Sequence, residues 1–417
     1  MLPESLAVLD RYQSLVTRDE DAEALVRIAE DEDPGRFPAE ETWHDFVRLY
    51  RTGLHPAIGL CVRHRGRVVL HRTIGHTLNH PDEAHVGDVA TPDTLFSLFS
   101  ASKIVTAMVV HALIEDGVLH LEERMGDTIP ELATRGKEAI RLRHLLNHTA
   151  GIPDMPRDFD VQSALGAGRI DVSTLESLRP SHEPGVNVAY HPMTSWIIVQ
   201  ELIERKTGKD LRHHLRSRFL DPMGLSHLNY GVADGDLGAV ARHAVTGLPV
   251  PGFMGRIFER TIGTDLHHAI RLSNEESFLT GVLPSANVIG SPGEMTAFMQ
   301  MLLDGGKAHG VRVLSPETVH RATTDITRAQ FDSTFGFPMR YGLGMMMGGN
   351  RFSLFGLGTR GAFGHLGLSA VVVYADPRRK LAVSFLNTGK TMAAPGMVQW
   401  AWCVQRILQA AAQAGKA

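Results

Sequence analysis

The chain has 417 residues, of which 43% are hydrophobic and 21% charged, so it can bury a large core in one big domain or two closely associated ones. Lys and Arg number 42 against 46 Asp and Glu, and both signs are interspersed, giving a formal net charge of -4. This balance argues against a nucleic-acid partner or a membrane-surface partner and favours a small neutral ligand. The N-terminus lacks a basic segment followed by an apolar one, and no run of about 18 apolar residues occurs. We therefore expect no membrane insertion and a cytoplasmic location.

Only two cysteines, Cys61 and Cys403, are present, and they lie far apart in the sequence. Neither has a CxxC partner or a Cys/His spacing typical of a zinc site. The sequence therefore predicts two buried thiols and no disulfide framework.

The first 53 residues mix apolar and charged positions at helical spacing, with an acidic loop around 31–35, and predict a helical N-terminal arm. Two β-prone runs follow at 57–62 and 67–71, and Arg65–Gly66 between them is typical of a hairpin turn. A sheet is expected to begin here.

From Ser100 the pattern changes to a long helix with one apolar face, which Gly117 is suited to end. The chain up to residue 284 then consists mostly of helix and loop, including helices over 196–206 and 211–219. Beyond it, the patterns predict a helix over 292–303, strands over 370–374 and 381–386, and a closing helix over 397–411.

Strand patterns thus bracket a helical middle, which predicts an α/β fold with an antiparallel sheet flanked by helices. We assign residues 1–53 to the arm, 54–98 and 285–417 to a discontinuous sheet domain, and 99–284 to an inserted, mainly helical domain. The interface between the sheet and the inserted domain is a favoured place for an active-site groove.

Ser100-Ala101-Ser102-Lys103 is the first candidate for catalysis. A serine at a helix N-terminus lies near free backbone N–H groups, and the helix dipole favours an alkoxide there. Lys103 returns to the same face one turn later, and a half-buried lysine can lose its proton near neutral pH and act as a base. Taken alone, this spacing is as well explained by an N-capping serine and a solvated lysine.

Three further motifs follow in order: Leu142–Gly151 (LRHLLNHTAG), Pro184-Gly185 ahead of Tyr190, and Gly364-His365-Leu366-Gly367 before β-prone segments. Together with the SxxK motif, they make the chain resemble the serine β-lactamase-related family, closest to its class C β-lactamase and esterase-like branch. The resemblance runs from about residue 57 to the last helix. It implies a sheet domain and a helical domain with the active site between them.

In that family the tyrosine corresponding to Tyr190 takes the serine proton and returns it to the leaving group. A phenol beside a lysine ammonium is favoured as phenolate, so Lys103 and Tyr190 could share one proton. The alternative is a tyrosine packed in a loop with its hydroxyl bonded to backbone. Pro192 stands where the β-lactamase branch commonly has asparagine, so the amide that would hold a β-lactam side chain is missing.

His365-Leu366-Gly367 resembles the family's Lys-Thr-Gly or His-x-Gly strand. The resemblance implies that the backbone N–H groups of Ser100 and Leu368 form the oxyanion hole, and Gly367 lets the strand edge approach the substrate. His365 replaces the fixed cation that would bind a β-lactam carboxylate, although an ordinary hydrogen-bonded histidine is the simpler alternative. His191 could tune the phenol of Tyr190 or merely brace a turn.

His144 and His148 have helical spacing, but no HExxH pattern and no evident third ligand accompany them, so we expect no metal. GLGTRG at 356–361 precedes a strand rather than a helix, which excludes dinucleotide binding. No cofactor is expected.

These motifs predict a serine hydrolase that works through a covalent acyl-enzyme, most simply a carboxylesterase on small or medium acyl esters. The segments 153–178 and 254–278 are expected to wall the pocket and set acyl size. The alternatives are a β-lactamase or D-amino-acid peptidase, an acyltransferase of the same fold, and a catalytically silent scaffold.

Overall fold

The computed structural model describes the chain except for residues 1–21, 79–85, 325–326, 352, 393–395 and 417. Its centre is a seven-stranded antiparallel sheet with the strand order β1-β3-β2-β15-β14-β13-β12. The strands are β1 Arg27–Ile28, β2 Ala57–His64, β3 Arg67–Gly75, β12 Met346–Met347, β13 Phe363–Leu366, β14 Val372–Asp376 and β15 Leu381–Asn387. The α/β class and the antiparallel sheet are those that the sequence predicted.

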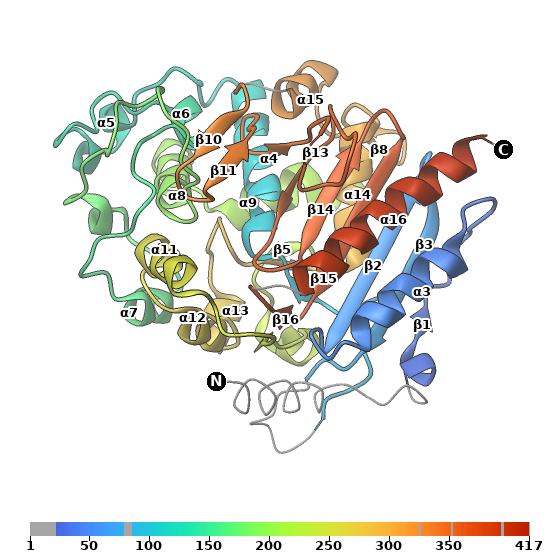
Figure 1. Ribbon diagram of the computed structural model, residues 1–417. Helices are drawn as coiled ribbons and strands as arrows, with labels where there is room; N and C mark the ends of the chain where they lie inside the picture. The colour runs from blue at the N-terminus through green and yellow to red at the C-terminus, as the bar shows by residue number, and fades with distance from the viewer. Residues whose placement is uncertain (1–21, 79–85, 325–326, 352, 393–395, 417) are drawn as a thin grey trace.

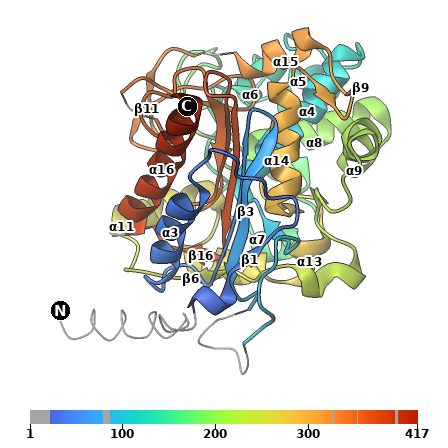
Figure 2. The same ribbon diagram turned by 90° about the vertical axis from the view of Figure 1, so that its right-hand side faces the viewer.

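Helices cover both faces of this sheet (Figures 1 and 2). Helices α3 (Ala39–Tyr50) and α16 (Gly396–Lys416) pack on one face, and α14 (Pro292–Leu303) packs on the other. Because neither face meets water, β14 and β15 are buried along their whole length. Cys61 and Cys403 are both free and buried, as predicted, and burial raises the pKa of each thiol to about 12.

The β2–β3 hairpin turns at Arg65–Gly66, as the sequence predicted. Arg65 has a φ of 54° and Gly66 a φ of 82°, and two consecutive positive φ values match the right-handed twist of a two-residue hairpin. Of the helical arm expected over residues 1–53, residues 1–21 lie outside the described part of the chain, and 39–50 form helix α3. The expectation was wrong for residues 27–28, which form β1 and pair with β3, because β3 would otherwise be an edge strand with unpaired N–H and C=O groups.

Helix α4 (Ser102–Glu115) runs through the middle of the molecule rather than along its surface. Twelve of its 14 residues are buried, so it is covered all round and not only on the one apolar face that the sequence indicated. Gly117, with a φ of 72°, follows its C-terminus as predicted. The helix connects the sheet to the helical half, which Figure 1 shows around α5, α6, α8 and α11.

None of the other described helices of that half is longer than α4. They are α5 Met125–Thr128, α6 Leu142–Leu146, α7 Val161–Gly166, α8 Thr194–Thr207, α9 Leu211–Leu215, α10 Asp221–Met223, α11 Gly252–Ile262, α12 Leu266–Ser273 and α13 Glu276–Thr280. Helix α15 is Pro316–Thr323, and single 3-10 or π turns are η1 Glu23–Leu25, η2 Phe99–Ala101, η3 Pro130–Leu132, η4 Val172–Leu175, η5 Arg216–Leu220 and η6 Asp234–Ala239. The helix expected over 211–219 is thus divided into α9 and the π turn η5.

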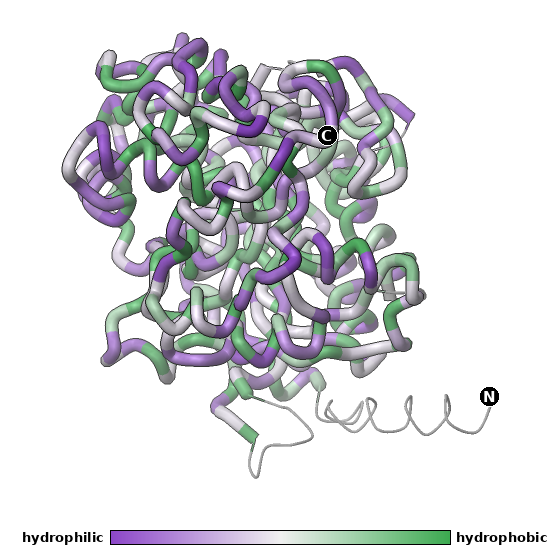
Figure 3. Tube along the Cα trace, turned by 90° about the vertical axis from the view of Figure 1, so that its left-hand side faces the viewer, coloured by the Kyte–Doolittle hydropathy of each residue, from purple (hydrophilic) through white to green (hydrophobic). Residues whose placement is uncertain are grey.

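Two small sheets connect the two halves, and two further strand pairs of the described chain are local hairpins. A three-stranded sheet joins β4 (Phe96–Ser97), β7 (Val288–Gly290) and β5 (Asn229–Tyr230), directly before the SxxK motif. The other pairs are β6 Ala244–Val245 with β16 Gly389–Lys390, β8 Lys307–Ala308 with β9 Val311–Arg312, and β10 Gln330–Asp332 with β11 Phe337–Met339. Figure 3 shows short hydrophobic and hydrophilic stretches alternating along the whole chain trace. Within the described residues, no helix combines the length and apolar character needed to cross a bilayer.

Candidate active site

Ser100 lies in the tight turn η2 between β4 and α4, at the centre of the molecule. Its neighbour Lys103 is in the first turn of α4, and the Lys103 Nζ atom donates hydrogen bonds to Ser100 Oγ at 3.1 Å and to the Ser285 carbonyl at 3.0 Å. The serine and the lysine of the SxxK motif are therefore in direct contact, as the one-turn spacing predicted.

Lys103 is completely buried, which is more than the half-burial that the sequence suggested. Its Nζ atom lies 5.3 Å from the Tyr190 ring centroid and 5.8 Å from that of Trp196. Burial penalises the ammonium and holds the pKa of Lys103 well below its usual value. Loss of the ammonium proton is therefore easier here than in water, which suits Lys103 to accept a proton from Ser100.

Tyr190 comes from the loop before α8 and is 6% exposed. Its hydroxyl is buried and has no hydrogen-bond partner among the described residues. Burial raises the pKa of the phenol, the Ser100 side chain opposes this shift, and the Asp332 charge adds to it. The sequence favoured a phenolate beside an ammonium, but desolvation in this site favours the uncharged forms of both groups.

His365 is the penultimate residue of strand β13 and is 1% exposed. Its ring centroid lies 5.8 Å from that of Tyr190, its Nδ1 atom bonds the Leu366 carbonyl at 2.6 Å, and its Nε2 atom is buried without a partner among the described residues. Burial, followed by the Lys103 charge, lowers the pKa of His365 to about 3. The residue is therefore a neutral imidazole at neutral pH and supplies no fixed cation.

Gly367 brings the end of this strand against the turn that carries the serine. A Cβ atom there would overlap the Leu98 carbonyl oxygen and lie 2.8 Å from the Val371 side chain, so only glycine fits. The next residue, Leu368, lines the same cavity as Ser100. The two backbones that the resemblance implied for an oxyanion hole thus lie at one pocket.

His148 and His191 form a second layer behind Tyr190. The His148 ring packs against those of Tyr190, Tyr341 and His191, with centroids 4.8, 4.7 and 5.9 Å away. His191 donates its backbone N–H to His148 Nδ1 and accepts the Ile152 N–H at Nε2. These contacts favour the turn-bracing alternative for His191. His144 bonds the Arg141 N–H at the start of α6, so it also has a structural role.

Sequence reasoning missed Asp332, a fully buried carboxylate at the end of β10. Its Oδ1 atom accepts hydrogen bonds from the N–H groups of Tyr190, Thr334 and Phe335, and its Oδ2 atom accepts one from the Tyr341 hydroxyl. The Asp-Ser-Thr run at 332–334 is typical of an Asx turn and could have indicated the two local bonds. Nothing in the sequence indicated the contact with Tyr190, 142 positions away.

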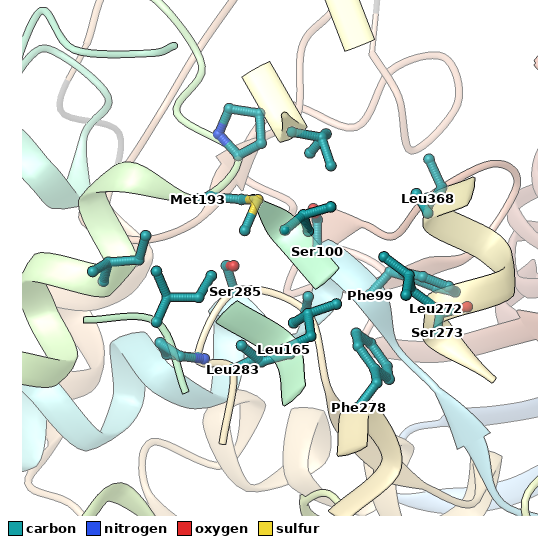
Figure 4. Close-up of a pocket in the computed structure, with 18 of the residues that line it drawn as sticks. Phe99, Ser100, Leu165, Met193, Leu272, Ser273, Phe278, Leu283, Ser285 and Leu368 are labelled. Atoms are coloured by element: carbon teal, nitrogen blue, oxygen red, sulfur yellow. The ribbon is translucent and has the colours of Figure 1, made fainter. Parts of the chain in front are cut away.

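A cavity of about 110 Å³ opens beside Ser100 (Figure 4). Both segments predicted to wall the pocket contribute to it, the first through α7 and Ile170 and the second through α11, α12 and α13. Among the described residues that line it, none is ionisable, and the polar ones are Ser100, Gln200, Ser273 and Ser285. The apolar ones are Phe99, Val161, Leu165, Ile170, Pro192, Met193, Ile197, Phe258, Ile262, Ala269, Leu272, Phe278, Leu283, Pro284, Ala286 and Leu368.

Comparisons with known proteins agree with this architecture. The sequence model of the Beta-lactamase family matches residues 46–401. A protein of Escherichia coli strain K12, provisionally named a D-alanyl-D-alanine carboxypeptidase, is 26% identical over 72% of this chain and 70% of its own length. The esterase/beta-lactamase LipL of Mycobacterium tuberculosis is 25% identical over 78% of this chain and 76% of its own. The crystal structure of a family VIII carboxylesterase, 23% identical, superposes with a TM-score of 0.75 over 91% of this chain and all of its own.

Proposed function

The chain belongs to the Beta-lactamase family and is a serine acyl hydrolase, and from this premise we propose that it is a carboxylesterase for esters of small or medium apolar acyl groups. The observation that carries the proposal is the character of the pocket beside Ser100. Its described lining is free of ionisable groups, so an uncharged apolar acyl chain can be buried there without an unpaired charge.

The two departures from the β-lactamase pattern point the same way. His365 is buried and neutral, so it gives no ion pair to the carboxylate of a β-lactam or of a peptide C-terminus. Pro192 lines the pocket with an apolar ring where an amide would be needed to bind an acylamino side chain. Both changes remove contacts that a β-lactam or a peptide would use and that a simple ester does not need.

In the proposed mechanism, Ser100 attacks the ester carbonyl and transfers its proton to the neutral amine of Lys103, which lies 3.1 Å away. The neutral Tyr190 hydroxyl gives its proton to the departing alkoxide and recovers one from the Lys103 ammonium. A water molecule then attacks the acyl-enzyme, and the same two groups move the proton in reverse. The backbone N–H groups of Ser100 and Leu368 stabilise the oxyanion.

The names of the relatives support this proposal in part. LipL is named as an esterase as well as a β-lactamase, and the superposed structure is titled a carboxylesterase, whereas the Escherichia coli relative is named for a peptidase. A substrate test must therefore include both classes of substrate.

The test begins with a fluorophosphonate probe, which we expect to label the wild-type protein and not Ser100→Ala. Turnover of p-nitrophenyl acetate and butyrate is then compared with turnover of a chromogenic cephalosporin and of a D-alanyl-D-alanine peptide. We expect the esters to be cleaved and the other two to be cleaved poorly. Rapid cleavage of the cephalosporin or the peptide with inert esters would refute the esterase proposal, and an unlabelled wild-type protein would refute the nucleophile.

A further inference from the structure

Phe99, the residue before the candidate nucleophile, has a backbone conformation that a bulky side chain rarely adopts. Its φ is 46°, in the left-handed region that glycine prefers. The turn is held on either side, because Leu98 donates its N–H to Val288 and its carbonyl accepts the Ala101 N–H. A strained conformation kept by its surroundings at an active site is a reason to look for a function of the side chain.

The Phe99 ring lines the acyl pocket, and Figure 4 shows it with Leu272, Ser273 and Phe278 on one side of that pocket. Its centroid lies 6.2 Å from that of Phe278, which also lines the cavity. With 6% of Phe99 exposed, the ring is a wall of the pocket and not a surface group.

The same ring also contacts two basic side chains. Its centroid lies 4.7 Å from the His243 ring and 4.9 Å from Lys390 Nζ. Strands β6 and β16 pair in parallel, with Lys390 opposite Val245 and His243 directly before β6, and Gly389 allows the backbone of Leu54 and His55 to approach β16 closely. We call His55, His243 and Lys390 the buried basic cluster.

The buried basic cluster is sealed from solvent, since its three members are 0 to 2% exposed. Lys390 is held by the Asn387 carbonyl at 2.8 Å. Burial holds the pKa of Lys390 and that of His243 well below their usual values, and it lowers the pKa of His55 to about 3, with the Lys390 charge acting in the same direction. None of the three is among the described residues that line the pocket, so the Phe99 ring separates the pocket from the cluster.

We propose that Phe99 is a specificity-determining residue whose ring ends the acyl pocket and stops an acyl chain short of the buried basic cluster. This inference rests on the proposed esterase function and adds its substrate class: apolar acyl chains with an upper length limit. The positive φ also makes the position testable. Replacing Phe99 by glycine removes the ring, and glycine adopts this backbone conformation without strain.

The experiment compares wild type with Phe99→Gly and Phe99→Ala, using kcat/KM for p-nitrophenyl esters with acyl chains from two to ten carbons. We expect the optimum to move to longer chains and the ratio of octanoate to butyrate to rise about tenfold, the effect of gaining room for at least one methylene group. Lys380→Gly is the matched control: it makes the same change at a positive φ of 52°, at an exposed turn between β14 and β15, and should leave the ratio unchanged.

A second readout separates this inference from the proposed function. Inactivation by fluorophosphonates with alkyl chains of increasing length needs only the nucleophile and the pocket, and not ester turnover. If the wild type cleaves no ester, the esterase proposal fails, while a shift of the inactivation profile in Phe99→Gly still supports the role of Phe99. An unchanged chain-length profile in folded Phe99→Gly and Phe99→Ala, with both readouts, would overturn it.

Discussion

Tyr190 is held in place by one buried side chain that comes from a distant hairpin. Asp332 accepts the Tyr190 N–H at 3.2 Å and the Tyr341 hydroxyl at 2.8 Å, and Tyr341 in turn packs against His148. The other titratable groups facing the phenol are Lys103, His148 and His365. Since burial disfavours the charge on these three basic groups, Asp332 is the charge expected to act on Tyr190 at neutral pH.

Asp332→Asn should therefore move the pH dependence of the reaction. Asparagine keeps an oxygen acceptor for the N–H groups but removes the negative charge, and that charge raises the pKa of Tyr190. With the charge gone, the phenol ionises at lower pH. Because Tyr190 must be protonated to donate to the leaving group, the alkaline decline of kcat should shift to lower pH.

The measurement is kcat for an ethyl ester, whose alkoxide needs a proton in order to leave, from about pH 8 up to the highest pH at which the protein stays folded, because burial holds the pKa of Tyr190 above its ordinary value of about 10. Tyr341→Phe is the control, because it removes one hydrogen bond from the Asp332 carboxylate and leaves the charge. Its alkaline limb should match that of wild type. A folded Asp332→Asn protein with an unshifted limb would show that the carboxylate has only a structural role.

Strand β13 and the turn before α4 are the two elements whose contact sets the distance between Leu368 and Ser100. That contact is closest at Gly367, where a side chain would overlap the Leu98 carbonyl. In the proposed oxyanion hole, one N–H comes from each element, so any separation of the two affects the transition state more than substrate binding.

Gly367→Ala should lower kcat by about 100-fold, the order expected when a catalytic group is displaced by about 1 Å. The free energy of unfolding should fall by only about 1–3 kcal/mol, the usual effect of an overpacked side chain. Gly255→Ala is the matched control: this glycine lies in α11 with open space around it, and alanine there should keep kcat and stabilise the helix by up to about 1 kcal/mol. Equal kcat values in both variants would contradict the role given to Gly367.

The two halves of the molecule share one hydrophobic core. The larger of the two buried clusters includes Ala57, Val371 and Leu386 from the sheet half and Leu142 and Trp196 from the helical half. Helix α4 belongs to the same cluster along most of its length. A continuous core of this kind couples the stabilities of the two halves, which are divided in sequence but not in packing.

We therefore expect one cooperative unfolding transition. Three of the four tryptophans, Trp43, Trp400 and Trp402, lie in the helices that cover the sheet, so fluorescence reports mainly on that half. Far-UV circular dichroism reports on the helices of both halves. The two midpoints should coincide, and the calorimetric and van't Hoff enthalpies should agree. Separate midpoints or two heat-absorption peaks would show that the halves unfold independently.

The sequence by itself was enough to predict the features that are formed by residues close together along the chain. The β2–β3 hairpin follows from Arg65–Gly66 between two β-prone runs, α14 begins and ends at the predicted residues, and the contact of Ser100 with Lys103 follows from one helical turn. The order of four short motifs was enough to indicate the family, which the match over residues 46–401 establishes.

Tertiary structure alone decided what surrounds those residues. Burial favours the uncharged form of both Lys103 and Tyr190, whereas the sequence suggested a phenolate beside a lysine ammonium, because desolvation depends on every element that covers these groups and not on their neighbours in sequence. Asp332 reaches Tyr190, and Lys390 reaches Phe99, only through contacts between segments far apart in the chain. The sequence thus determined which groups could carry out the chemistry. Packing determined which protonation state each group favours, which side chains lie behind it, and which ring forms the wall of the pocket.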